Sequence, residues 1–144
     1  MSYIKIYVHY VWSTKNRMPL LTTDIRHKVF KHIKENARDK GIYIDFINGY
    51  IDHIHCLISL NDDISISKIA QLIKGESSFW INKNKLTNTK FAWQKEYFAI
   101  GVCDDKIQII RDYIANQDNH HIKMSFAQEY DKFIKRYGFD IIKS

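Results

Sequence analysis

Apolar and polar residues alternate along several stretches of this chain. The alternation, or an enrichment in β-branched and aromatic residues, occurs in four segments, at residues 3–12, 42–50, 53–60 and 97–103. A period of two places successive side chains on opposite faces of a sheet, so each segment is predicted to be a strand. The second and third segments are joined tightly around Asp52 and should form an antiparallel hairpin.

Helical periodicity separates these strands. Apolar residues recur every four positions after Thr22 or Thr23, which predicts a helix that ends near Gly41. Further helices are expected from about Ser65 to Trp80, from Asp104 or Asp105 past Tyr113, and over residues 126–137. The resulting order, β-α-β-β-α-β-α with an added C-terminal helix, predicts a ferredoxin-like α+β fold: a four-stranded antiparallel sheet with two helices packed across one face.

Length and charge limit the functional classes. The 144 residues fit one domain, spanning residues 1–144, and carry 22 Lys and Arg against 16 Asp and Glu, a net charge of +6. This balance fits either a polyanionic partner or a solvated lysine-rich surface. No leader and no apolar run near the ~20 residues of a membrane span is found, so we expect a cytoplasmic protein without a membrane partner. Cys56 and Cys103 lie in apolar segments and are interpreted as buried thiols.

The most informative segment contains the sequence Asp52-His53-Ile54-His55-Cys56. In a strand His53 and His55 project from the same face, while Ile54 and Cys56 face the core. Two neutral imidazoles side by side form a metal-binding pair, but a metal needs at least a third ligand. The alternative is a pair of exposed strand histidines.

The third predicted helix offers such a ligand. Tyr113 and Gln117 are four residues apart and His120 follows three residues later, so the three side chains would share one helical face. That face could place a hydroxyl and an amide oxygen beside the histidine pair. The alternative makes Tyr113 a packed aromatic residue and Gln117 a solvated neighbour.

Together these features resemble the single-tyrosine HUH transposases of the insertion-sequence 200/605 type, which include the repeat-associated tyrosine transposases; HUH denotes two histidines separated by a hydrophobic residue. The resemblance covers nearly the whole chain. One departure is Ile51, where the family often has Pro before the Asp of the histidine motif. The matching segments are His9-Tyr10-Val11-Trp12-Ser13-Thr14-Lys15-Asn16-Arg17, Asp52-His53-Ile54-His55, Lys74-Gly75-Glu76-Ser77-Ser78, Trp93-Gln94-Lys95-Glu96-Tyr97-Phe98 and Tyr113-Ile114-Ala115-Asn116-Gln117.

The resemblance implies a chemistry. His53, His55 and Gln117 would hold one Mg²⁺ or Mn²⁺ ion, and Tyr113 would be the nucleophile that cuts and rejoins single-stranded DNA through a 5′-phosphotyrosine intermediate. Separately, the helical spacing would let His120 approach the metal or Tyr113 as an accessory acid or base; the alternative is that the helix ends before His120 and that His120 and His121 lie at the surface. The resemblance also implies DNA with hairpin ends as substrate and a homodimer in which Tyr113 acts in cis or in trans.

Basic residues are the candidates for contacts with DNA phosphates, and those we single out are Lys15, Arg17, Lys74 and Lys95. Two other readings stay open. A non-catalytic or domesticated ferredoxin-like nucleic-acid-binding protein would not need Tyr113 or Gln117. A zinc site would use His53 and His55 with His120 or His121, and it would leave Tyr113 without a role.

Overall fold

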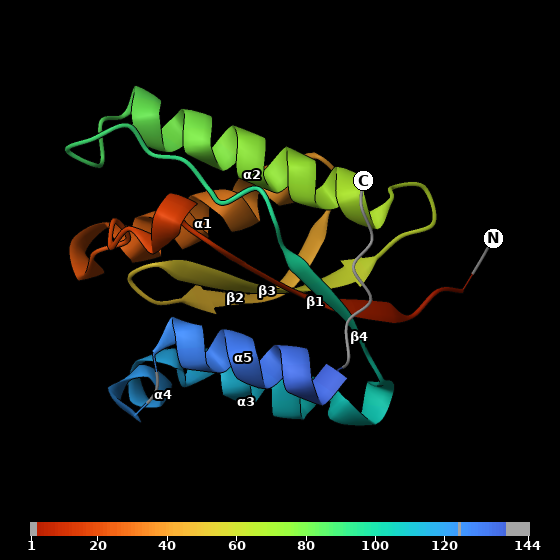
Figure 1. Cartoon of the computed structure of the whole chain (residues 1–144). Helices are drawn as coiled ribbons and strands as arrows, with labels where there is room; N and C mark the ends of the chain where they lie inside the picture. Colours follow the sequence, from red (N-terminus) through yellow and green to blue (C-terminus); the bar gives the residue numbers. More distant parts are fainter. Residues whose placement is uncertain (1–2, 124, 138–144) are drawn as a thin grey trace.

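A computed structural model of the chain describes residues 3–123 and 125–137, and gives the backbone alone for residues 120, 122, 123, 130 and 133–137. Its centre is one four-stranded sheet in the order β2-β3-β1-β4, with every neighbouring pair antiparallel. This is the strand order of a ferredoxin-like sheet, so the predicted fold class is confirmed (Figure 1). The strands are β1 Ile6–Ser13, β2 Tyr43–Gly49, β3 His53–Leu60 and β4 Phe98–Val102.

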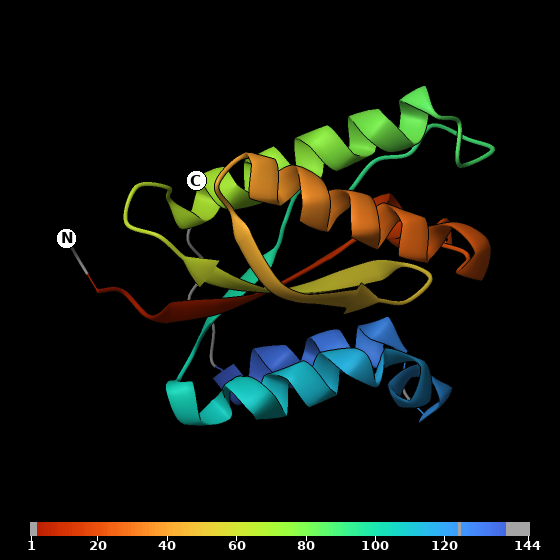
Figure 2. The same ribbon diagram turned by 180° about the vertical axis from the view of Figure 1, so that it is seen from behind.

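Helices cover both faces of the sheet. Two long helices, α1 Thr23–Asp39 and α2 Ile66–Lys83, lie on one face, as predicted. The other face is covered by α3 Ile107–Ala115, α4 Gln117–Lys123 and α5 Phe126–Tyr137 (Figures 1 and 2). None of the helices in the described part of the chain is long and apolar enough to cross a bilayer.

The two layers of helices create two apolar clusters. On the α1/α2 side, Tyr10 and Trp12 of β1 pack with Ile54 and Ile58 of β3, and the Tyr10 hydroxyl donates to the carbonyl of Ile66 over 2.9 Å. On the other side, Leu57 packs against two residues of α3, Ile107 and Ile114. Because helices cover β3 from both sides, both its apolar and its polar residues are buried along most of its length.

Three of the element boundaries that differ from expectation bear on the predictions above. β1 begins at Ile6 rather than at Tyr3, and Ile6 itself is exposed. β4 ends at Val102, and Cys103 precedes a 3₁₀ turn at Asp104–Lys106, so Cys103 is exposed and its prediction as a buried thiol was wrong. The third helix ends at Ala115, because Asn116 (φ −94°, ψ 27°) separates it from α4.

The β2–β3 hairpin depends on a close backbone approach at Gly49. A Cβ atom at this position would lie 2.3 Å from the carbonyl oxygen of His53 and 3.0 Å from the ring of Phe30. We therefore expect Gly49→Ala to lower the free energy of unfolding by about 3 kcal/mol, measured by urea denaturation. Gly75→Ala is the control: its Cβ meets nothing within 4 Å, and alanine within a helix is expected to be neutral or stabilising. Equal midpoints for the two variants would contradict the tight hairpin.

Candidate functional site

His53 and His55 project from β3 toward the layer formed by α3, α4 and α5. Their ring centroids lie 5.1 Å apart, and neither side chain is exposed. The pair therefore lies on one face of the strand, as the alternation predicts, while Ile54 and Cys56 belong to the opposite core. The alternative of two exposed strand histidines is wrong, because side chains of α5 cover both rings: Phe126 stacks on His53, and Glu129 contacts His55.

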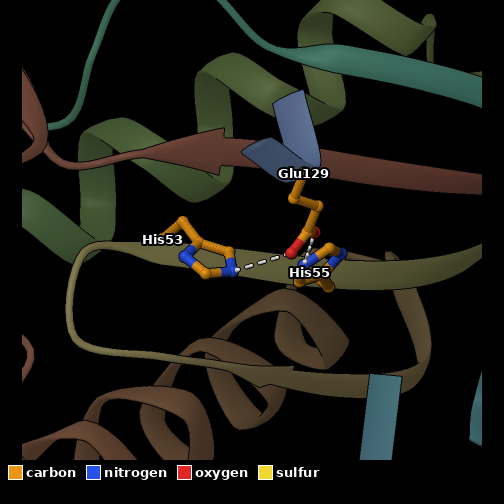
Figure 3. A group of neighbouring side chains, drawn as sticks. All are labelled: His53, His55 and Glu129. Atoms are coloured by element: carbon orange, nitrogen blue, oxygen red, sulfur yellow. Dashed lines mark ion pairs between the residues drawn. The ribbon is translucent and has the colours of Figure 1, made fainter. Parts of the chain in front are cut away.

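A carboxylate from α5 completes this cluster. Glu129 Oε1 lies 2.9 Å from His55 Nε2, and Glu129 Oε2 lies 3.9 Å from His53 Nε2. One ligand atom from each of the three residues falls within 4.8 Å of the others (Figure 3). Glu129 is 2% exposed and was not anticipated from the sequence.

Gln117 lies where the sequence prediction put it, beside the histidine pair. Its Oε1 is 3.0 Å from His53 Nε2 and 3.1 Å from His121 Nε2, while its Nε2 donates to the carbonyl of Tyr113 over 3.3 Å. His121 Nε2 also lies 2.9 Å from Glu129 Oε2. Gln117 is the first residue of α4 rather than part of the tyrosine helix, and the side chain of His120, predicted as an accessory group, lies outside the described residues.

The far ring nitrogens of both histidines are also held. His53 Nδ1 lies 2.8 Å from Asp52 Oδ1, and His55 Nδ1 lies 2.9 Å from Nε2 of the buried His9. In metal sites such outer partners fix the ring and its tautomer, so that the other nitrogen can present its lone pair. If His55 carries its proton on Nδ1 and donates it to His9, the lone pair on His55 Nε2 points toward Glu129.

The electrostatic environment favours neutral rings beside an ionised carboxylate. Burial lowers the pKa of His55 to about 4, and burial together with the nearby His55 lowers the pKa of His9 to about 3. For Glu129, burial pushes the pKa upward, but the contact with His121 and the nearby rings of His55 and His53 outweigh it and hold the pKa below its usual range.

This donor set fits a divalent cation. Two imidazole nitrogens, an amide oxygen and a carboxylate converge, and a lone pair on His55 Nε2 facing Glu129 across 2.9 Å requires either a proton or a cation to balance it. The carboxylate adds a hard oxygen ligand to a set otherwise dominated by nitrogen, which suits Mg²⁺ and Mn²⁺ better than the two histidines and Gln117 alone.

Tyr113 lies next to the cluster within the same chain. Its ring centroid is 5.6 Å from that of His55 and 6.3 Å from that of His9, both in edge-on arrangements. The helix carrying it, α3, is held on β2 by a bidentate pair in which Arg111 donates to Asp45 over 2.7 Å for both bonds. Asn48 Nδ2 adds a hydrogen bond of 2.9 Å to the carbonyl of Ile114. These contacts hold the Tyr113 ring beside the histidine pair of its own chain.

The four basic residues predicted to contact DNA fall into two groups. Lys15 and Arg17 are exposed in the 3₁₀ turn after β1, and the Arg17 guanidinium lies 5.4 Å from the ring centre of Phe126, at the edge of the site. Lys74 lies on α2, against the opposite face of the sheet, where its Nζ donates to the carbonyl of Lys95 over 2.8 Å. Of these four residues, Arg17 is the one that its contact with Phe126 places at the edge of the histidine cluster.

Comparison with protein families supplies the classification. The family model described as "Transposase IS200 like" matches residues 2–117, which is most of the chain. The chain belongs to this family of IS200-like transposases. The match includes His53, His55, Tyr113 and Gln117 but ends before Glu129.

Solved structures of similar fold agree with this assignment. One, described as a candidate transposase from Deinococcus radiodurans R1, has a TM-score of 0.64 at 20% identity, and the alignment covers 81% of this chain and 93% of that one. A second, a REP-associated tyrosine transposase bound to a REP hairpin, has a TM-score of 0.63 at 19% identity, with 84% and 72% covered. No curated protein sequence matches this transposase significantly.

Sequence reasoning missed two residues of the cluster, His9 and Glu129, and named His121 only as a ligand of the alternative zinc site. Both missed residues carried a signal. His9 belongs to the polar side of β1, which proves to be the same sheet face as His55. Glu129 follows Phe126 by three residues on the apolar stripe of α5, where an acidic residue is costly unless it has a partner.

Proposed function

We propose that residues 1–144 act as one HUH transposase domain that cuts and rejoins single-stranded DNA, with Tyr113 as the nucleophile. The observation that supports this most directly is the convergence of His53, His55 and Gln117 into one buried cluster, with the Tyr113 ring edge-on to His55. An IS200-like transposase needs a nucleophile and a cation site side by side, and this arrangement supplies both.

In the proposed reaction, the Tyr113 phenolate oxygen attacks the scissile phosphorus. A bond forms between that oxygen and phosphorus, the bond from phosphorus to the 3′-oxygen breaks, and the leaving oxygen takes up a proton to become a 3′-hydroxyl. The DNA 5′-phosphate stays on Tyr113. Attack by a second 3′-hydroxyl reverses these events and joins the strand to a new end without an external energy source.

We assign His53, His55 and Gln117, together with Glu129, to the binding of one Mg²⁺ or Mn²⁺ ion. When bound, this ion polarises the scissile phosphate and offsets the charge of the displacement. Asp52 and His9 orient the two imidazoles from behind, and Arg111 keeps α3 against β2 so that Tyr113 stays near the cluster.

Access to the cluster requires movement. His53, His55, Gln117 and Glu129 are at most 2% exposed, so a DNA phosphate cannot reach them while α4 and α5 lie as they do here. Entry of DNA would therefore displace part of this cover, so that a phosphate could approach His53 and His55.

The substrate we propose is a DNA strand with a hairpin end, handled by a homodimer in the cytoplasm. The similar REP-associated tyrosine transposase is bound to a REP hairpin, and the net charge of +6 suits a polyanion. Because α3 docks on the sheet of its own chain, the proposed dimer does not need to exchange tyrosine helices to complete each site.

The decisive experiment is covalent capture. Wild-type protein incubated with labelled single-stranded DNA from element ends and Mn²⁺ should give a protein–DNA adduct on a denaturing gel, and Tyr113→Phe should give none. Tyr43→Phe, which removes a hydroxyl from an exposed tyrosine on β2, should keep the adduct. Adduct formation by Tyr113→Phe, or its persistence in EDTA, would refute the mechanism.

A zinc site is the second candidate, because His121 Nε2 lies 3.1 Å from Gln117 Oε1 and 2.9 Å from Glu129 Oε2, within the same cluster. A site using His53, His55, His121 and Glu129 would prefer zinc to manganese by a wide margin. Adduct formation that depends on Mn²⁺ and is inhibited by Zn²⁺ would exclude zinc as the working ion.

A further inference from the structure

A hollow of about 520 Å³ opens beside the histidine cluster, along the edge formed by β1, β4 and the turn after β1. Val11 and Ser13 line it from the sheet face that also carries His9. Phe126 of α5 forms the wall shared with the cluster, because its ring stacks on that of His53 with centroids 4.3 Å apart and planes 18° apart. The hollow and the candidate cation site are therefore immediate neighbours.

The lining combines flat aromatic surfaces with one cation. Phe98 and Phe126 line it, and the Arg17 guanidinium lies 5.4 Å from the Phe126 ring centre. Tyr97 also lines it, but its ring stacks on Tyr10 of the α1/α2 cluster. Aromatic rings and arginine planes are the groups on which unpaired nucleobases stack. The volume is also in the range of pockets that enclose small organic groups.

Polar groups also line this hollow. Gln94 holds the rim together: its Oε1 accepts from the backbone N–H of Asn16 over 3.3 Å, and its Nε2 donates to Glu96 over 2.9 Å. Trp12 also lines the hollow; it is 2% exposed, and its Nε1 has no hydrogen-bond partner among the described residues. A buried indole N–H without an acceptor is costly, and a ligand acceptor or a water would satisfy it.

We propose that this hollow holds one unpaired nucleobase of the DNA strand, next to the phosphate that is cut. The inference rests on the proposed function, since it assumes a single-stranded DNA substrate at the histidine cluster. Because Phe126 both lines the hollow and stacks on His53, a base held against Phe98 would be a neighbour of the phosphate proposed to bind at the histidine cluster. Since β1, β4 and the Lys15–Arg17 turn supply the other walls, the base site persists if α5 shifts to admit DNA.

The test is an abasic scan measured as binding in EDTA, where no cleavage occurs. Oligonucleotides from the element end, each with one base removed, are titrated against wild type, Phe98→Ala and Arg17→Ala. In wild type we expect one position near the cleavage site at which base removal weakens binding about tenfold. In Phe98→Ala the intact oligonucleotide should bind about tenfold more weakly, and removal of that same base should cost less than about twofold further.

Two control variants separate stacking from other effects. Phe79→Ala removes an exposed aromatic ring from α2, on the opposite side of the sheet, and should retain the wild-type scan. Lys15→Ala removes the same charge as Arg17→Ala and should weaken all oligonucleotides equally, because Lys15 does not line the hollow. If Phe98→Ala fails to fold, Gln94→Ala at the rim of the hollow is tested in its place. Removal of the sensitive base should then also cost this variant less than about twofold in binding.

A flat scan in wild type, or a position-specific loss that Phe98→Ala and Arg17→Ala leave unchanged, would overturn the base site. This result is distinct from failure of the proposed function. A flat scan together with a Tyr113 adduct rejects the hollow alone, whereas a position-specific scan without any adduct keeps the hollow and rejects the cleavage mechanism.

Discussion

Binding of Mn²⁺ is expected to be lost when His53 and His55 are both replaced by alanine. The two rings supply the nitrogen ligands of the cluster, and their Nε2 atoms face Glu129 at 3.9 and 2.9 Å. Removal of an outer partner of a metal ligand already costs roughly 10–100-fold in affinity, so removal of two direct ligands should cost more than about a hundredfold. Isothermal titration of the metal-free protein with Mn²⁺ measures this directly, without DNA.

The same titration tests the ligand that the sequence did not reveal. Glu129→Gln keeps the shape of the side chain but removes its charge, and we expect Mn²⁺ affinity to fall about tenfold or more. Two exposed residues of α1 provide matched controls: His27→Ala and Glu35→Gln should bind Mn²⁺ as the wild type does. If Glu129→Gln binds with wild-type affinity, Glu129 covers the site but is not a ligand.

The histidine variants will also be less stable, and this has to be separated from the loss of affinity. His55 contacts both Glu129 and His9 in a fully buried cluster, so its removal leaves a buried carboxylate with fewer partners. Breaking a buried charged contact costs about 3–5 kcal/mol. A loss of Mn²⁺ affinity can be attributed to the missing ligands only if the variants are folded. Far-ultraviolet circular dichroism at the titration temperature is the measurement that checks this.

The sheet and the histidine pair could be predicted because both depend on local patterns. A period of two fixes which residues share a face of β3, and burial on both sides of the strand does not alter that rule. The helix over residues 126–137 was predicted with the bounds that α5 has, because its apolar positions keep a strict helical period.

The long-range part of the site could not be predicted in this way. The period of α5 shows that one stripe is buried, but not against which face of the sheet, and only that placement brings Glu129 to His55. Likewise, the spacing of Tyr113 and Gln117 suggested one continuous helix, whereas the turn at Asn116 ends α3 and lets Gln117 start α4. Gln117 still contacts His53, so the predicted contact is present although Tyr113 and Gln117 do not share one continuous helix.

The buried histidines should make the metal-free protein unstable in weak acid. In the unfolded chain His9 and His55 take up protons below about pH 6.5, but in the folded state their pKa values are lowered to about 3 and about 4. The unfolded state therefore binds more protons below pH 6.5, so stability falls as the pH drops toward 4.

Between pH 7.5 and pH 5.0 each of these two histidines is expected to remove about 2 kcal/mol from the free energy of unfolding, measured by urea denaturation in EDTA. Measurements above pH 5 exclude a contribution from Glu129. Its lowered pKa reduces the free energy of unfolding only below about pH 4.5. His9→Gln should reduce the loss over this range by about 2 kcal/mol, because glutamine takes up no proton. His27→Gln, at an exposed position of α1, should keep the wild-type loss. A His9→Gln variant that loses as much stability as the wild type would show that His9 is not held neutral by its burial against His55.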